Sequence, residues 1–434
     1  MKIHDFGSST AGGMARISAT VTWEDSAHDR QEIYMETNAC FADDLNCNPN
    51  AFLLAAVIPA MRRGERRVLV DGVVCPQLRN GLITAMQILE RWYGKSPQGS
   101  VTIEATQGFE PRLPRQPSRT ASFMSGGVDS LTTLRCNRLD FPLDHPGSIR
   151  DCFFVYGFDM GFEIDMGDFK TLDKSKENFE LVVSSLAKLA EEAKTTLIPV
   201  YWNIRCLNGD SGVGQLFVMQ SHGAALGAVA HAFSRRITTA TIGSSYNIRE
   251  LEPWGSHPLL DPNYSSAEVY IQHDGARFSR LEKVGLIAEW DAALKTLRTC
   301  GNPLRPGDLI NCGRCEKCLR TMVELVAYDK LKQCKTFPLT DVSAEMLQAL
   351  NVSFYSESRS PWTFLTVGNE CHWRHLLSPL KRIGRIDLVE VIEAKLAEYE
   401  RWQKRLNRKD ALKRLDSRYL GERLARMKRR IRDK

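Results

Sequence analysis

The feature that most constrains this chain is the hexapeptide Ser-Gly-Gly-Val-Asp-Ser at residues 125–130. An apolar run at 121–124 precedes it, and a run that favours a helix follows at 131–134. This order predicts a strand, a glycine turn and the start of a helix. Such a turn directs backbone N–H groups toward a ligand at the positive end of the helix dipole, which favours phosphate.

The residues of this loop suit phosphate chemistry individually. Gly126 and Gly127 allow a sharp turn and a close approach to an anion. The hydroxyls of Ser125 and Ser130 add hydrogen-bond donors. The Asp129 carboxylate is repelled by phosphate unless it orders the loop or faces a magnesium ion. Ser125 and Asp129 are therefore candidate catalytic residues, and the alternative is a purely structural Gly-Gly turn.

The loop differs from the common P-loop and from the dinucleotide fingerprint. It resembles the pyrophosphate loop of the N-type ATP pyrophosphatases. That resemblance implies that ATP, with Mg²⁺, is split between its α and β phosphates and that AMP is transferred to a substrate oxygen.

A second cluster lies downstream in the sequence Cys-Gly-Arg-Cys-Glu-Lys-Cys at 312–318. Cys312, Cys315 and Cys318 have two-residue gaps, and Cys300 precedes them. Four thiolates can enclose a tetrahedral Zn²⁺, and a filled shell indicates a structural ion. An iron–sulfur cluster uses similar spacings, and unligated reduced cysteines are a third interpretation.

Together the two motifs resemble the 7-cyano-7-deazaguanine synthase family over about residues 120–326. The segments at 153–159, 241–245 and 280–283 fit the family's order more loosely, and Lys283 is the candidate catalytic cation among them. The resemblance implies a nucleotide site formed by Ser125, Gly126, Gly127, Asp129, Ser130, Tyr156, Gly157, Gly243 and Ser244.

This sequence also departs from that family. Residues 246–264 replace the short substrate segment, and the chain is about twice as long as the core enzyme. The departures indicate a paralogue, with adenylation of a deazapurine-type carboxylate and formation of an amide or nitrile as the implied chemistry. Related paralogues imply a protein or peptide acceptor in anti-phage defence, and the family implies a homodimer.

Other candidates for the chemistry and for the function stay open. Arg280 and Arg249 are further cations, and His222, His257 and His273 are base candidates that also suit structural roles. The alternative functions are a sulfur-transferring or tRNA-modifying pyrophosphatase and a non-catalytic nucleotide-binding scaffold. A glutaminase of the asparagine-synthetase type is disfavoured, because residue 2 is lysine rather than cysteine.

Alternating strand and helix patterns dominate the central region. Strands are expected at 121–124, 153–156, 196–200 and 238–242, and helices at 130–138, 176–193 and 220–234. This predicts an α/β fold with a doubly wound parallel sheet, adenine nucleotide alpha hydrolase-like by the resemblance. We expect an α+β accessory domain at 1–118, the pyrophosphatase domain with its zinc knuckle at 119–335, and a helical, basic region at 336–434.

The accessory region is predicted from its own local patterns. Strands are expected at 15–23, 32–36, 67–70 and 101–105 and helices at 50–59 and 82–93, with Asn50 as a helix cap. The proline-rich stretch at 111–118 predicts a linker between the accessory region and the central region.

Composition separates the C-terminus from the rest of the chain. Residues 401–434 hold fifteen Lys or Arg and four Asp or Glu, so the preceding residues sum to −5 within the net +6. Leucines at helical spacing predict an amphipathic helix, for which docking to protein or a solvated surface is favoured over nucleic acid. No long apolar run, no signal-like start and scattered cysteines predict a cytoplasmic protein without a membrane span.

Overall fold

The computed structural model describes residues 1–158, 160, 169–208, 216–300, 309–351 and 369–419. It divides into two compact units. The first comprises Met1–Asn311 with Gln333–Pro338, and the second comprises Cys312–Lys332 with Leu339–Lys434.

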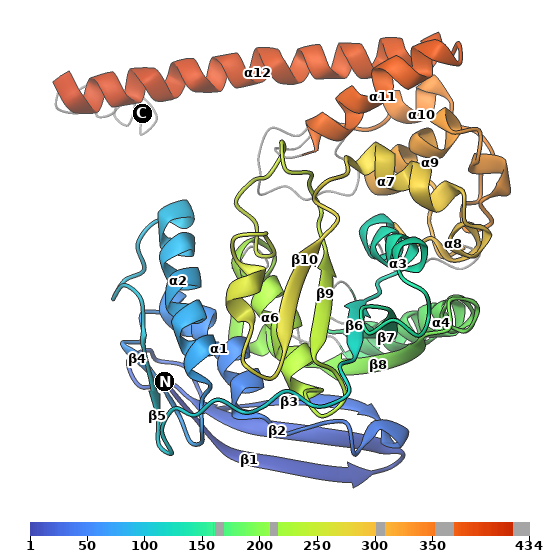
Figure 1. The fold of residues 1–434 in the computed structure, drawn as a ribbon. Coiled ribbons are helices and arrows are strands. Elements are labelled where there is room, and N and C mark those ends of the chain that lie inside the picture. Colours follow the sequence, from blue (N-terminus) through green and yellow to red (C-terminus); the bar gives the residue numbers. More distant parts are fainter. Residues whose placement is uncertain (159, 161–168, 209–215, 301–308, 352–368, 420–434) are drawn as a thin grey trace. The chain divides into compact units, whose positions relative to one another are not determined.

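Ten strands form the sheet of the first unit (Figure 1). They are β1 Lys2–Ala11, β2 Met14–Thr22, β3 Gln31–Asn38, β4 Arg67–Val70, β5 Thr102–Ala105, β6 Thr120–Phe123, β7 Ile149–Tyr156, β8 Thr196–Trp202, β9 Thr239–Gly243 and β10 Tyr270–Asp274. The helices of this unit are α1 Pro49–Arg62, α2 Pro76–Tyr93, α3 Val128–Asp140, α4 Phe169–Glu192, α6 His222–Ala232, α7 Arg280–Ala288 and α8 Asp291–Thr296.

The sheet has the order β10-β9-β6-β7-β8-β3-β2-β1-β4-β5 and is mostly parallel. Strands β10 to β8 are parallel throughout, as are β1, β4 and β5. The pairs β8–β3, β3–β2 and β2–β1 are antiparallel. The predicted α/β class with a parallel central sheet is thus confirmed.

The N-terminal strands extend the same sheet. Strand β3 pairs with β8, with Met35 opposite Trp202, and the Thr37 hydroxyl donates to the Pro199 carbonyl oxygen at 2.7 Å. One apolar core also contains side chains from both regions, including Ile33 and Val200. Strands before and after residue 118 therefore share one compact unit, and the division into three domains stays a prediction.

Helices cover both faces of the central strands. In β10 the Asp274 carboxylate accepts a hydrogen bond from Thr133 of α3, whereas the preceding residue, His273, lies 2.7 Å from the Asp261 carboxylate. Consecutive strand residues point to opposite faces. Because Asp261 belongs to a segment that packs against α6, helices α3 and α6 lie on opposite faces of the sheet.

Most predicted elements are present, with differences at their ends. The N-cap of α1 is Asn48, not Asn50: the Asn48 side chain accepts from the Asn50 N–H at 3.1 Å. Pro49 occupies the first helical position, where its missing N–H has no consequence. Strands β1 and β10 were not predicted, because few of their side chains are apolar and buried.

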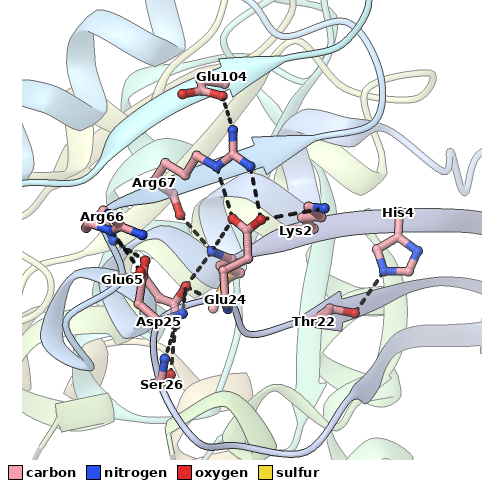
Figure 2. Close-up of polar contacts among 11 residues, drawn as sticks. Lys2, His4, Thr22, Glu24, Asp25, Ser26, Glu65, Arg66, Arg67 and Glu104 are labelled. Atoms are coloured by element: carbon pink, nitrogen blue, oxygen red, sulfur yellow. Dashed lines mark hydrogen bonds and ion pairs between the residues drawn. The ribbon is translucent and has the colours of Figure 1, made fainter.

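A polar network connects the start of β1 with the residues that follow β2 and with β4 (Figure 2). The Glu65 carboxylate is completely buried and accepts from the backbone N–H groups of Glu24 and Ser26 at 3.0 Å. It also pairs with the terminal ammonium of Met1. Arg67 joins Glu24 to Glu104, at 3.0 and 2.8 Å. Each buried charge in this network therefore has a partner of opposite sign.

The second unit is helical in its described part. Its helices are α9 Glu316–Ala327, α10 Ala344–Gln348, α11 Glu370–Arg382 and α12 Ile386–Tyr419. The buried Glu316 carboxylate accepts from Trp373 Nε1 at 3.1 Å, which joins α9 to α11, and it pairs with Arg320 of its own helix at 3.0 Å. The predicted C-terminal helix is part of α12, while the basic run at 423–434 lies outside the described residues.

No helix in the described ranges combines the length and the apolar character needed to cross a bilayer.

Candidate functional site

The glycine loop lies between β6 and α3, as predicted. Gly126 has φ +74°, a conformation in which side chains are strained. The Gly127 N–H donates to the Ser125 hydroxyl oxygen at 3.2 Å, and the Ser130 hydroxyl donates to the Gly127 carbonyl at 3.0 Å. Gly127 is the N-cap of α3 and supplies no side-chain cap, so the first-turn amides of the helix suit an anion.

Lys283 and Asp129 form the charged pair beside this loop. The Lys283 ammonium lies 3.0 Å from Asp129 Oδ1 and also donates to the Ser244 carbonyl oxygen. The Lys283 side chain is 1% exposed, and that of Asp129 is 28% exposed. A Ser279–Glu282 capping box fixes the first turn of α7, which holds Lys283 in place.

The end of β9 touches the start of α3. A Cβ atom on Gly243 would lie 3.0 Å from the Asp129 carbonyl oxygen, so the strand end and the helix turn approach closely. The Ser244 N–H donates to the Asp274 carbonyl at 2.7 Å, and the Ser244 hydroxyl donates to the Tyr246 carbonyl at 2.6 Å. Gly243 and Ser244 therefore lie beside the loop, and their role in binding a nucleotide stays a prediction.

Tyr156 and Gly157 end the neighbouring strand β7. Gly157 has φ +101°, and a Cβ atom there would lie 2.0 Å from the Trp202 carbonyl oxygen. The Tyr156 ring packs among Phe179 and Tyr201, with centroid distances of 5.1 and 6.0 Å. The turn thus follows a carboxyl end of the sheet, while the tyrosine ring belongs to the aromatic packing.

The strand order places these segments at a switch point. From β6 the chain proceeds to β7 and β8 on one side and later returns to β9 on the other side. Crossovers therefore diverge between β6 and β9, where open α/β sheets bind ligands beyond the carboxyl ends of the strands. The loop after β6 and Gly243 after β9 flank this position.

The other predicted cations and bases differ in their surroundings. Arg249 is exposed, and Arg280 is half-buried at the start of α7. His222 Nδ1 lies 2.8 Å from the Val218 carbonyl, and His257 Nδ1 accepts from the Leu259 N–H at 3.0 Å. Burial lowers the pKa of His257, and so does the charge of His273, against the raising effect of Asp261.

Two residues of the site were missed from the sequence. The Arg298 N–H donates to the Gly126 carbonyl at 2.7 Å, so the segment that precedes Cys300 fixes the backbone of the glycine loop. The Asp274 carboxylate holds Thr133 of α3 at 2.9 Å. Neither residue lies in a recognisable motif, and both reach the loop only through the tertiary fold.

The four predicted cysteines form one cluster. The sulfur atoms of Cys300, Cys312, Cys315 and Cys318 all lie within 4.8 Å of one another, and all four residues are buried. Gly313 has φ +68°, which suits the turn between the first two cysteines of the knuckle. The Asn311 side chain accepts from the Cys300 N–H at 3.1 Å and so fixes the backbone there.

These thiols fit a metal such as zinc. A Zn–S distance of about 2.3 Å in a tetrahedron requires sulfur–sulfur distances of about 3.8 Å. Cys312 Sγ and Cys318 Sγ are 3.8 Å apart. The four residues fill a tetrahedral shell, so such an ion would stabilise the fold and leave no open position for a substrate.

Comparison of the chain with protein-family models, curated proteins and solved structures found no match.

Proposed function

We propose that this protein is an ATP-dependent ligase of the N-type ATP pyrophosphatase class, related to 7-cyano-7-deazaguanine synthase. The observation that carries the proposal is the buried Lys283 ammonium, 3.0 Å from Asp129 and beside the glycine loop at the switch point. The strand order β8-β7-β6-β9-β10 supports the adenine nucleotide alpha hydrolase-like fold that the motif implies.

The loop supplies the groups that would bind ATP. Gly126, Gly127 and the first-turn amides of α3 bind the phosphates, and the Ser130 hydroxyl adds a donor. The Asp129 carboxylate is partly exposed and keeps an oxygen that does not face Lys283, so it fits a Mg²⁺ ligand. Bound Mg²⁺ would neutralise charge on the phosphate oxygens.

Two transfers complete the reaction. A carboxylate oxygen of the substrate attacks the α-phosphorus, the α–β phosphoanhydride bond breaks, and pyrophosphate leaves with the electron pair. An amine then attacks the acyl carbon, a proton is lost from its nitrogen, and AMP leaves. Lys283 stabilises charge that develops on the phosphate oxygens, because a buried cation acts strongly in a site from which water is excluded.

The implied substrate is a deazapurine-type acid, and the amine is ammonia or an amino group of a protein or peptide. Residues 246–264, which replace the family's short substrate segment, support a rebuilt acceptor side. Attachment to such a partner fits an anti-phage defence role. A tRNA-modifying pyrophosphatase is the alternative enzyme, and a non-catalytic nucleotide-binding scaffold is the alternative from another class.

The test is incubation of the purified protein with ATP, Mg²⁺ and a deazapurine carboxylate, with and without ammonia. Mass analysis should find AMP and pyrophosphate, which Ser125→Ala and Asp129→Asn should reduce by at least ~100-fold. Asp140→Asn, at the exposed far end of the same helix, should keep full activity. Formation of ADP, or nucleotide binding without turnover, would contradict the proposal, and the second result would favour the scaffold.

A further inference from the structure

A cavity lies at the opposite edge of the same strands. Its volume is about 470 Å³, and its walls come from the segments that lead into β6 and β7. The linker at 111–118 and the turn before Ile149 thus border a cavity, open to solvent, at the amino-terminal edge of the parallel sheet. The glycine loop follows β6, at the carboxyl edge.

One arginine on this wall, Arg119, forms an ion pair with a buried carboxylate. Both carboxylate oxygens of Asp151, which is completely buried, accept from Arg119. Arg236 shares Asp151 and also binds Asp44 at 2.6 Å. The two arginines and the two carboxylates balance in charge, so Arg119 fixes the wall without adding positive charge.

The positive charges of the other two arginines on the wall, Arg115 and Arg150, are not balanced by an ion pair within the described part of the chain. Arg115 donates to the Arg236 carbonyl oxygen at 2.6 Å, a neutral acceptor. Arg150 has no carboxylate partner among the residues that the structure describes. Burial is the main cause that lowers the pKa of the nearby Arg138, and the charge of Arg150 lowers it further. Asp144 is the one carboxylate on the wall.

A histidine adds a donor of defined tautomer. The Gly147 N–H donates to His145 Nδ1 at 3.0 Å, so a neutral His145 ring carries its proton on Nε2. The ring stacks on Phe141 with centroids 4.7 Å apart, which fixes its orientation. The lining therefore contains two arginines without a carboxylate partner in the described ranges and one histidine, against a single carboxylate, Asp144.

We propose that this cavity binds a small phosphate-bearing anion. Its volume falls within the range of small-molecule sites, and guanidinium forks match phosphate oxygens in geometry and charge. Arg115 and Arg150 hold the anion, and His145 orients it. Because the cavity and the glycine loop lie at opposite edges of the sheet, a ligand in one site does not compete directly with a ligand in the other.

The test uses inorganic pyrophosphate as the probe, with calorimetric titration of the full chain. Arg150→Gln and Arg115→Gln should each weaken binding by about 10- to 100-fold, because each removes a charge-assisted contact. Arg112→Gln is the matched control, since Arg112 is exposed in the same linker and does not line the cavity. Lys283→Met separates this site from the proposed ATP site and should leave the Arg150-dependent binding in place.

Histidine ring resonances give a second, local measurement. Pyrophosphate should shift the Nε2 signal of His145 in the native protein and in Lys283→Met, and not in Arg150→Gln. Binding that Lys283→Met abolishes, while Arg115→Gln and Arg150→Gln leave it unchanged, would overturn the proposal and would leave the proposed ATP site intact.

Discussion

The Lys283 ammonium and the Asp129 carboxylate lie 3.0 Å apart although 154 positions separate them in the chain. The pair joins the first turn of α7 to the first turn of α3. An ammonium buried to this degree needs a partner, and Asp129 with the Ser244 carbonyl supplies it. A buried ammonium therefore lies beside the loop for which the sequence predicts phosphate binding.

Replacement of Lys283 by methionine removes this charge and keeps most of the side-chain volume. The proposed function predicts a fall in kcat/KM for AMP formation of at least ~100-fold, because the cation acts on charge that develops in the transition state. Lys295→Met, on the exposed face of α8, is the control and should retain activity. Equal activity in the two variants would exclude a catalytic role for Lys283.

The turn after β7 tolerates glycine alone. Gly157→Ala should destabilise the protein by about 3 kcal/mol or more, because the added methyl group meets the Trp202 carbonyl at 2.0 Å in a strained backbone conformation. Gly12 also has a positive φ, +59°, but open space around it, so Gly12→Ala should cost only about 1 kcal/mol. Urea unfolding measures both, and equal losses would contradict the close approach at Gly157.

The cysteine cluster predicts a bound zinc ion. Elemental analysis of the purified protein should find about one zinc per chain, lost in Cys312→Ser. Cys334→Ser is the control, since Cys334 is buried and its thiol donates to the Leu294 carbonyl at 3.2 Å, outside the cluster. Iron with visible absorbance would show an iron–sulfur cluster instead.

The polar network of Met1, Glu24, Glu65 and Arg67 predicts that acid lowers the stability of the fold. Arg67 lowers the pKa of Glu24 from 4.5 to about 2 by hydrogen bonding. Since the folded-state pKa lies below the unfolded one, the contribution of Glu24 to stability is present above about pH 4.5 and is lost as the pH falls toward about 2. Glu24→Gln should therefore lower the Tm at neutral pH.

The difference between native protein and Glu24→Gln should then shrink at about pH 2.5. The exposed Glu32, paired with Arg16 at 3.1 Å, provides the comparison, and Glu32→Gln should change the Tm little at either pH. A Glu24→Gln effect that is the same at both pH values would contradict this account.

Local patterns predicted the elements that carry local signals. The strand before Ser125 and the helix after it were predicted because the apolar run, the glycines and the helix start are contiguous. Strand β10 was missed because its residues Gln272, His273 and Asp274 are polar; its place in the sheet comes from pairing with β9 and not from burial of every side chain.

Long-range contacts account for what the sequence did not reveal. The cysteine spacing predicted four neighbouring thiols, and the family resemblance made Lys283 a candidate catalytic cation. The support of Gly126 by Arg298 and of α3 by Asp274 follows only from the folded arrangement of distant segments. The pairing of Met35 with Trp202 likewise has no counterpart in local periodicity.

The antiparallel junction between β3 and β8 has a consequence for biosynthesis. Thr37 meets its acceptor, the carbonyl of Pro199, only 162 positions later in the chain. During translation the outer edge of β3 therefore stays without its partner strand while the next segments emerge, and an open edge of this kind recruits other strands. A nascent chain that stalls before β8 would present that edge to neighbouring chains.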